Sequence, residues 1–261
     1  MTDADAHAHD IAIRVRGLRT RFGSQVIHDD LDLDVRRGEV LGVVGGSGTG
    51  KSVLLRTIIG LNRPAAGEIE VLEQNLTRST AAQRRRIEER WGVLFQDGAL
   101  FSSLTVFQNI LVPLKEHTDL DMRLMCEITD LKIGLVGLPP EAADKYPSEL
   151  SGGMRKRAGL ARALALDPAI VFLDEPTAGL DPIGAAAFDE LIARLRAALG
   201  LTVFMVTHDL DSLHAICDRI AVLAEKRVMV CGPMSEMLVN DHPWIHEYFH
   251  GPRARAAQGG N

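Results

Sequence analysis

The stretch Gly45-Gly46-Ser47-Gly48-Thr49-Gly50-Lys51-Ser52 decides how the rest of the chain is interpreted. It follows Val40-Leu41-Gly42-Val43-Val44, an apolar run typical of a short buried strand, and precedes Val53 to Ile59, which predicts the start of a helix. A glycine-rich turn that joins a strand to a helix and ends in Lys-Ser is the P-loop pattern G-x-x-x-x-G-K-[ST]. The strand and the helix favour this interpretation over a surface turn that is merely rich in glycine.

The residue types of the P-loop suit a triphosphate. Glycines let the backbone turn tightly, so that successive N–H groups converge on phosphate oxygens, and the helix N-terminus adds its positive dipole end. Lys51 can reach the β- and γ-phosphates, and the Ser52 hydroxyl can ligate Mg²⁺. The chain is therefore predicted to bind a nucleoside triphosphate with Mg²⁺.

Composition narrows the class of protein. The chain has 261 residues, 46% of them hydrophobic, which is enough for one large α/β domain with a subdomain. A net charge of −6 argues against a nucleic-acid partner. The three cysteines form no C-x-x-C, which fits a reducing cytosol, and no apolar run reaches the about 18 residues of a membrane span. Residues 1–10 and the segment after Gly251 are expected to be disordered tails.

The regions on either side of the P-loop differ in their patterning. Alternation over Ile11 to Val15 and Leu31 to Val35 predicts an antiparallel β layer ahead of the loop. Phe22 belongs to this layer, and its position alone favours packing in the core of the layer over stacking on a base. From about Asp97 to Leu166 the pattern becomes helical, which predicts a helical insert between two halves of a parallel sheet.

Two acidic residues follow another buried strand. Ala169 to Leu173 is apolar, and Asp174-Glu175 stand at its carboxyl end, the edge at which open α/β sheets bind ligands. Asp174 fits the acidic group that supports Mg²⁺, and Glu175 is placed to polarise a water. The pair could also cap a surface turn, but the P-loop in the same chain favours the catalytic interpretation.

Three more polar features stand at the ends of predicted elements. Leu150-Ser151-Gly152-Gly153 precedes a helix, and it fits a second anion-binding terminus and an ordinary N-cap equally well. Gln96 ends a strand over Val93 to Phe95. His208 follows the buried run Leu201 to Val206, where it could contact a γ-phosphate or serve the structure alone.

In this order the motifs resemble those of the ATP-binding-cassette (ABC) ATPases, from roughly Ile11 to Leu238. The resemblance implies a P-loop NTPase (RecA-like) parallel sheet with an N-terminal antiparallel β layer and an α-helical subdomain insert. The nucleotide-binding domain would cover residues 11–240, the subdomain residues 97–166, and a C-terminal helix and tail residues 241–261. Leu150 to Gly153 matches the LSGG signature, which is unique to this family.

The resemblance also implies roles for individual residues. Phe22 would be the adenine-stacking aromatic, although Tyr is commoner there, and Met154 stands where many relatives have Gln. Catalysis would involve Lys51, Gln96, Glu175 and His208, and Mg²⁺ would be held by Ser52, Gln96 and Asp174. The residues implied to bind ATP are Phe22, Gly45, Gly46, Ser47, Gly48, Thr49, Gly50, Lys51, Ser52, Gln96, Asp174, Ser151, Gly152, Gly153 and Asp181.

Family geometry implies an ATPase that dimerises head to tail around two ATP and drives a separate transmembrane permease. A finer resemblance, over Phe95 to Phe101, Leu150 to Arg157 and Glu175 to Ile183, is to the Mla phospholipid transporters. It implies cargo movement between inner and outer membrane, MCE-domain and STAS-domain subunits, and a peripheral position on the cytoplasmic face of the inner membrane. The alternatives are an importer ATPase for an amino acid or metal, and a soluble ABC ATPase acting on DNA or ribosomes.

One apolar segment allows two interpretations. Leu100, Phe101, Leu104 and Phe107 follow Gln96 closely. They could form the core of the helical insert, or some could line an exposed groove for a permease helix.

Overall fold

The computed structural model describes residues 10–251, and the chain divides into two compact units. The first unit contains the chain up to Arg84 and from Thr202 onward, and the second contains Arg85–Leu201. The predicted disordered tails lie outside the described residues, apart from Asp10. Within residues 10–251, no helix is both long enough and apolar enough to cross a membrane.

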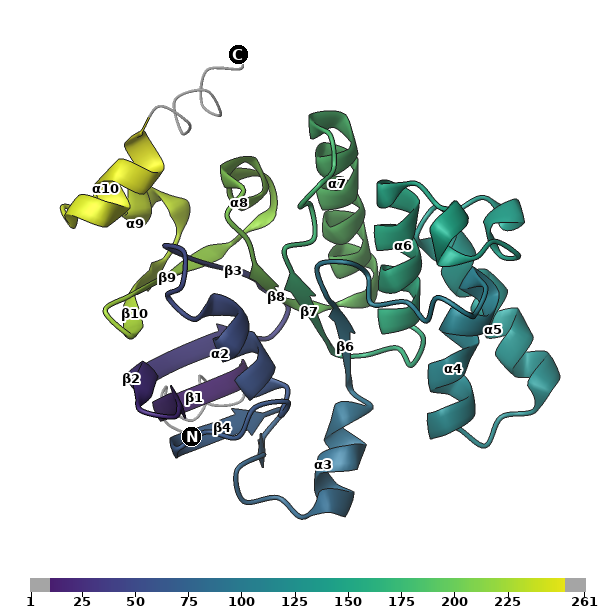
Figure 1. Ribbon diagram of the computed structural model, residues 1–261, viewed down its shortest axis with the longest axis horizontal. Coiled ribbons are helices and arrows are strands. Elements are labelled where there is room, and N and C mark those ends of the chain that lie inside the picture. Colours follow the sequence, from purple (N-terminus) through teal and green to yellow (C-terminus); the bar gives the residue numbers. More distant parts are fainter. Residues whose placement is uncertain (1–9, 252–261) are drawn as a thin grey trace. The chain divides into compact units, whose positions relative to one another are not determined.

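The first unit opens with an antiparallel sheet whose strand order is β2-β1-β4-β5. Val15 of β1 lies opposite Leu33 of β2 and opposite Ile69 of β4. All three side chains are buried, so the alternating pattern faces a core and the predicted antiparallel β layer is confirmed. These strands are β1 (Ile11–Phe22), β2 (Gln25–Arg36), β4 (Ala66–Val71) and β5 (Gln74–Asn75) (Figure 1).

A second set of strands in this unit has the order β10-β9-β3-β8. β3 pairs in parallel with both β8 and β9, and β9 and β10 form an antiparallel hairpin. Every residue of β3 and β8 is buried, which explains their unbroken apolar runs. The bounds are β3 (Val40–Gly45), β8 (Thr202–Val206), β9 (Arg219–Ala224) and β10 (Arg227–Gly232).

The helices of the first unit are α2 (Lys51–Ile58), α8 (Leu210–Ile216), α9 (Met234–Leu238) and α10 (Pro243–His250). The last two pack on one apolar core with β3, α8 and β9, formed by Val44, Leu213, Ile220, Val222, Met237, Ile245 and Phe249. The C-terminal helices are therefore docked on the unit that carries the P-loop (Figure 1).

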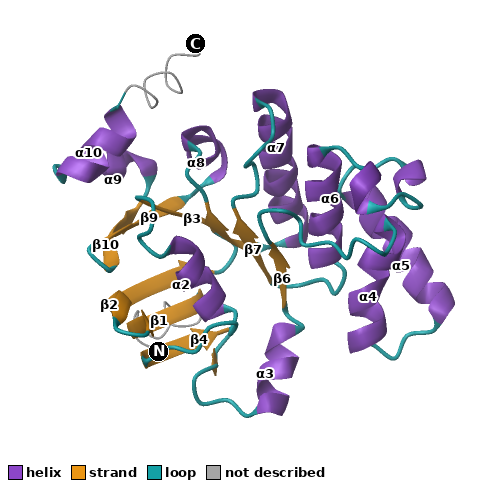
Figure 2. Cartoon of the chain, in the orientation of Figure 1, coloured by secondary structure: helices purple, strands orange, loops and turns teal. Residues whose placement is uncertain are grey.

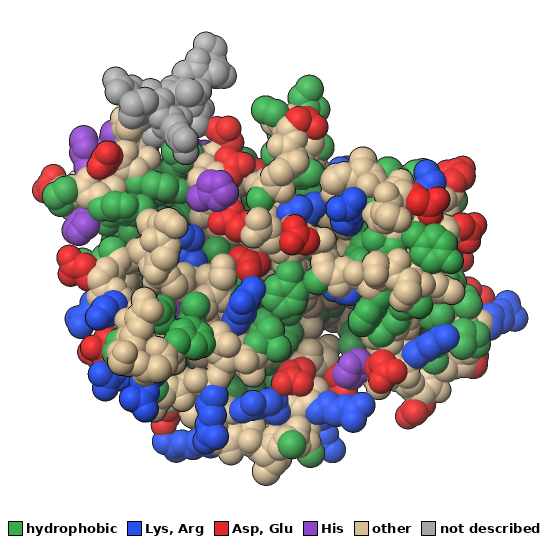
Figure 3. Space-filling model, in the orientation of Figure 1, with side chains coloured by type: hydrophobic (Ala, Val, Ile, Leu, Met, Phe, Trp, Pro, Cys, Tyr) green, Lys and Arg blue, Asp and Glu red, His purple; other side chains and the backbone are tan. Residues whose placement is uncertain are grey.

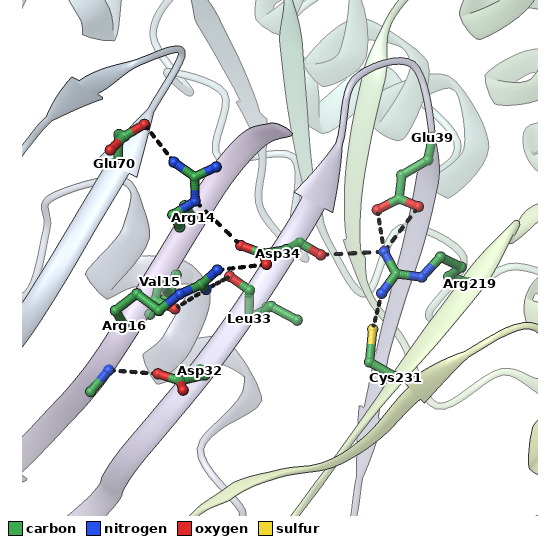
Figure 4. Close-up of polar contacts among 11 residues, drawn as sticks. Arg14, Val15, Arg16, Asp32, Leu33, Asp34, Glu39, Glu70, Arg219 and Cys231 are labelled. Carbon is green, nitrogen blue, oxygen red and sulfur yellow. Dashed lines mark hydrogen bonds and ion pairs between the residues drawn. The ribbon is translucent and has the colours of Figure 1, made fainter. Parts of the chain in front are cut away.

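An ion-pair network joins the two sets of strands (Figure 4). The guanidinium of Arg219 on β9 donates to the Glu39 carboxylate at 3.1 Å and to the Asp34 carbonyl at 3.4 Å. It also contacts Cys231 Sγ at 3.0 Å. Burial raises the pKa of the Cys231 thiol to about 11, so this cysteine stays protonated and does not act as a thiolate ligand.

The second unit pairs β6 (Trp91–Leu94) with β7 (Ile170–Asp174) in parallel. Three of its helices pack together in Figure 2, namely α4 (Val106–His117), α5 (Met122–Leu135) and α6 (Gly152–Ala163). All three lie within residues 97–166, the stretch whose patterning predicts helices. The remaining elements are α7 (Pro182–Leu199), the short 3-10 helices η1 (Pro140–Ala142) and η2 (Pro147–Glu149), and α3 (Ala81–Glu88), which spans the boundary in sequence.

Side chains of both charges lie on the face shown in Figure 3, with Lys and Arg gathered along its lower edge. Within residues 10–251, no group of three or more His, Cys, Asp or Glu side chains could hold a metal ion.

Candidate active site

The P-loop lies between β3 and α2, as the sequence predicts. A Cβ on Gly45 would come within 2.5 Å of the Leu223 carbonyl oxygen, so only glycine fits there. Gly48 and Gly50 have φ values of 77° and 98°, in the left-handed region that favours glycine. These glycines hold the backbone in the tight turn that a phosphate cradle needs.

The ammonium of Lys51 is held over the start of the loop. Its Nζ donates to the carbonyl oxygens of Gly45 at 2.7 Å and Gly46 at 3.1 Å. The Thr49 hydroxyl also donates to the Gly46 carbonyl at 2.9 Å. A positive charge and the N-terminus of α2 therefore lie at the same turn, and both suit a phosphate group.

A buried histidine lies beneath the loop, and the sequence interpretation missed it. His28 of β2 is fully buried, and its Nδ1 lies 2.8 Å from the Thr20 hydroxyl. A Cβ on Gly50 would stand 2.6 Å from His28 Nε2 and 2.5 Å from the Ile27 side chain. Burial lowers the pKa of His28 to about 4, with a partial offset from the Gly50 backbone, so the ring is neutral near pH 7.

His208 lies in the first unit, just after β8. The Tyr248 hydroxyl of α10 donates to the His208 carbonyl at 3.1 Å, and Trp244 stacks on Tyr248 with ring centroids 4.9 Å apart. A Cβ on Gly46 would lie 3.7 Å from Trp244 Nε1. Helix α10 thus contacts both the P-loop and the His208 segment. The spacing of Trp244 and Tyr248 at i,i+4 was the available signal.

The second unit gathers the other predicted residues around α6. Ser151 is the N-cap of this helix, and its Oγ accepts a hydrogen bond from the Met154 N–H at 3.3 Å. A Cβ on Gly152 or Gly153 would lie 3.8 or 3.9 Å from Leu180 Cδ2. The Ser-Gly-Gly start of α6 is therefore next to the Ala178-to-Asp181 turn. Asp181 itself caps α7, accepting from the Gly184 N–H at 2.9 Å.

Asp174 and Glu175 stand at the end of β7, as predicted. Asp174 is buried, whereas Glu175 is partly exposed and has a φ of 52°, in the left-handed region. The Lys156 ammonium of α6 donates to the Glu175 carbonyl at 2.9 Å. The sequence interpretation did not single out Lys156, because one lysine in a basic helix carries no special signal.

Gln96 is exposed on the loop that follows β6. Arg162 of α6 anchors this loop by donating to the carbonyl oxygens of Ala99 at 2.7 Å and Gly98 at 3.3 Å. Farther along, the fully buried Asn109 side chain accepts from the Phe101 N–H at 2.8 Å and donates to three carbonyl oxygens, those of Phe101, Leu104 and Thr105. The loop is thus a fixed structure rather than an open tether.

One aromatic prediction needs correction, and one open alternative is decided. Phe22 is 54% exposed at the end of β1, so the expectation that it packs in the core of the β layer is wrong. Phe101 is 52% exposed, with the Arg162 guanidinium 5.9 Å from its ring centroid, so of its two interpretations the core of the helical insert is excluded. Exposed aromatic rings of this size are available for a ligand or a partner.

The donor types fit ATP and Mg²⁺. The tight turn of the loop requires glycine at Gly45 and Gly50, where a Cβ would strike Leu223 and His28, and Lys51 supplies the cation. The Ser52 hydroxyl, the Asp174 carboxylate and the Gln96 amide are the hard oxygen ligands that Mg²⁺ prefers. Ser52 belongs to the first unit, and Gln96 and Asp174 belong to the second.

Comparison with known proteins places these motifs in a family. The family model described as ABC transporter matches residues 28–178. The probable ribonucleotide transport ATP-binding protein mkl of Mycobacterium leprae is 42% identical, over 93% of this chain and 70% of the relative. The intermembrane phospholipid transport system ATP-binding protein MlaF of Escherichia coli K12 is 39% identical, over 92% of this chain and 88% of the relative.

Solved structures agree with this result. The cassette MJ0796, in a dimeric post-hydrolysis state bound to ADP and Pi, matches with a TM-score of 0.77 at 26% identity, over 85% of this chain and 98% of that one. The cbiO1 structure from Clostridium perfringens, part of the transporter complex cbiONQ, matches with a TM-score of 0.80 at 28% identity, over 96% of this chain and 99% of that one. The chain belongs to the ABC transporter family and is one of its ATP-hydrolysing cassettes.

Proposed function

We propose that this chain is the ATPase subunit of a transporter that moves phospholipid between the inner and outer membranes. The observation that carries the proposal is its similarity to MlaF, at 39% identity over 92% of the chain and 88% of the relative. The chain and MlaF therefore correspond over nearly their whole lengths. Ribonucleotide is the second candidate cargo, because the printed name of mkl contains it and mkl is 42% identical, although the match spans only 70% of mkl.

The residue roles are part of the proposal. Lys51 and the P-loop N–H groups bind the β- and γ-phosphates, and the exposed Phe22 ring stacks on the adenine. Ser52, Asp174 and Gln96 hold Mg²⁺, which offsets phosphate charge when it is bound. Glu175 accepts a proton from the attacking water, and His208 helps to orient that water.

Hydrolysis of ATP is phosphoryl transfer to water, and it depends on positioning and charge more than on covalent catalysis. The attacking water forms a bond to the γ-phosphorus as the bond to the β,γ-bridging oxygen breaks. The water proton passes to the Glu175 carboxylate, and the leaving ADP oxygen keeps the electron pair. Lys51 offsets the charge that spreads over the phosphate oxygens.

A second copy of the chain completes each site. The Ser151-Gly152-Gly153 start of α6 binds the ATP held by the partner copy, with its N–H groups facing the γ-phosphate. The dimeric MJ0796 cassette supports this arrangement. Asp181 caps α7 and follows Leu180, whose side chain lies beside the start of α6, and it belongs to the same proposed dimer surface.

Gly153→Asp tests the composite site. A carboxylate beside a γ-phosphate would repel it, so this variant should bind ATP as a monomer yet lose turnover and nucleotide-dependent dimerisation. Gly134→Asp is the matched control, because a Cβ there meets nothing within 4 Å and the residue lies on α5. Normal ATPase activity in Gly153→Asp would contradict the composite site.

The assembled transporter would contain a transmembrane permease, with MCE-domain and STAS-domain subunits, and would place the cassette on the cytoplasmic face of the inner membrane. Affinity purification from solubilised membranes should recover a permease rather than DNA or ribosomes. The purified complex, reconstituted in liposomes, should move labelled phospholipid only with ATP, and Glu175→Gln should abolish the movement. Accumulation of labelled ribonucleotide instead would favour the mkl-like cargo.

A further inference from the structure

We propose that Lys156 is a positioning residue that holds the backbone of Glu175 from helix α6, and so links the helix that meets the partner's ATP to this copy's own hydrolytic carboxylate. The inference rests on the proposed function, specifically on the catalytic role of Glu175. It adds Lys156 to the residues of the site, and it adds a coupling that runs from the start of α6 to Glu175. All of the contacts that carry it lie within the second unit.

The backbone at Glu175 needs external support. Its φ of 52° lies in the left-handed region, which residues with a side chain rarely adopt and which persists only where the surroundings impose it. The Glu175 carbonyl accepts hydrogen bonds from the Lys156 ammonium at 2.9 Å and from the Ala178 N–H at 3.2 Å. One bond closes the local turn, and the other ties the turn to α6.

Lys156 is unusual among lysines in being only 6% exposed. Burial lowers its pKa, and the negative charges of Asp97, Glu175 and Asp174 oppose that shift. The ammonium is therefore coupled electrostatically to Asp97 and to both acids at the end of β7. Its hydrogen bond to the Glu175 carbonyl at 2.9 Å comes from a buried cation, and such a bond holds the carbonyl in position.

Helix α6 carries this contact rigidly. Its N-cap, Ser151, lies little more than one turn before Lys156. Farther along, a Cβ on Gly159 would lie 3.0 Å from the Gly98 carbonyl oxygen, and Arg162 donates to that oxygen at 3.3 Å. A shift of α6 caused by ATP binding at its start would move the Lys156 ammonium, and the Glu175 carbonyl would move with it.

Lys132 provides a matched control. It is also buried, at 3% exposed, and lies in the same unit, but its ammonium pairs with Asp167 rather than with any predicted site residue. Lys132→Met therefore measures what the loss of a buried lysine does to folding alone. Lys156→Met and Lys156→Arg measure the loss of the contact and the change of its geometry.

The experiment measures melting temperature, affinity for a fluorescent ATP analogue, kcat, KM and the Hill coefficient for ATP with the full chain. Lys156→Met should lower kcat by at least about 10-fold with nucleotide affinity and KM changed by less than about 2-fold, and it should lower the Hill coefficient. Lys132→Met should lower the melting temperature while kcat stays near wild type. Equal losses of kcat in the two variants at matched stability would overturn the proposal.

Lys156→Arg separates positioning from charge. Arginine keeps the cation that neutralises the acids, but its planar guanidinium cannot occupy the place of an ammonium. Positioning predicts that Arg restores stability while kcat recovers only in part, and full recovery of kcat would overturn the proposal. Glu175→Gln tests separately the proposed function on which this inference rests. Normal activity in that variant would refute the catalytic role of Glu175, whatever the Lys156 variants show.

Discussion

The buried His28 beneath the P-loop leads to a prediction about acid stability. The ring is neutral in the folded protein because burial lowers its pKa to about 4, whereas the unfolded chain protonates near the ordinary value of 6.5. Below pH 6.5 the unfolded state therefore binds one more proton at this position than the folded state does. The free energy of unfolding falls as the pH is lowered through this window, and the loss is complete near pH 4.

The magnitude follows from the two pKa values. One pKa unit corresponds to about 1.4 kcal/mol, so His28 alone should remove about 2 kcal/mol by pH 5 and about 3 kcal/mol by pH 4. That is a large share of the roughly 5–15 kcal/mol that stabilises a typical domain. The full burial of the ring means that solvent screens this effect very little.

Urea unfolding at a series of pH values tests the prediction, with His28→Asn as the comparison. Asparagine does not titrate, and its amide can still hydrogen-bond the Thr20 hydroxyl that lies 2.8 Å from His28 Nδ1. The variant will be less stable than wild type at pH 7.5 because it leaves a cavity, but the difference should shrink as the pH falls to 4.5. Parallel curves for the two proteins would refute the assignment of a neutral, buried His28.

Four further predictions concern single side chains. Lys51→Ala should abolish tight ATP binding, and an unchanged affinity in a titration would refute the P-loop assignment. Phe101→Ala should lower the unfolding free energy by about 1 kcal/mol or less, because the ring is half exposed. The same variant should assemble less well with the permease, and normal assembly would place the docking surface elsewhere. Asn109→Ala should cost about 3 kcal/mol in chemical denaturation, since buried backbone groups lose their partner. Tyr248→Phe should keep the ring stack on Trp244 but lower kcat a few-fold, and full activity would show that the hydroxyl bond to His208 has no role.

The parts of the fold that could be predicted are those in which a local pattern has one physical solution. The unbroken apolar run before Gly45 marks a strand covered on both faces, and β3 is buried throughout. A glycine is required at Gly45 because the Leu223 carbonyl leaves no room for a Cβ.

The parts that could not be predicted depend on contacts between distant segments. Phe22 and Phe101 are apolar, and a sequence cannot say whether an aromatic ring near the end of an element turns inward; both rings are about half exposed. Burial lowers the pKa of His28, with a partial offset from the Gly50 backbone, and nothing in β2 indicates that the P-loop lies above it. Such residues become visible only when the tertiary structure shows what covers them.

Lys156 shows most clearly why a motif is an incomplete description of a site. The LSGG signature ends at Gly153, and the apolar strand with its two acids ends at Glu175. A comparison of motifs treats these two segments as independent. In the folded unit, the Lys156 ammonium on α6, the helix that begins at the signature, donates to the Glu175 carbonyl oxygen at 2.9 Å. Glu175 has a left-handed φ, so under our proposal the geometry of this proposed catalytic residue depends on a helix whose start is proposed to bind another copy's nucleotide. A dimer built in this way can make hydrolysis at each site conditional on ATP at the other.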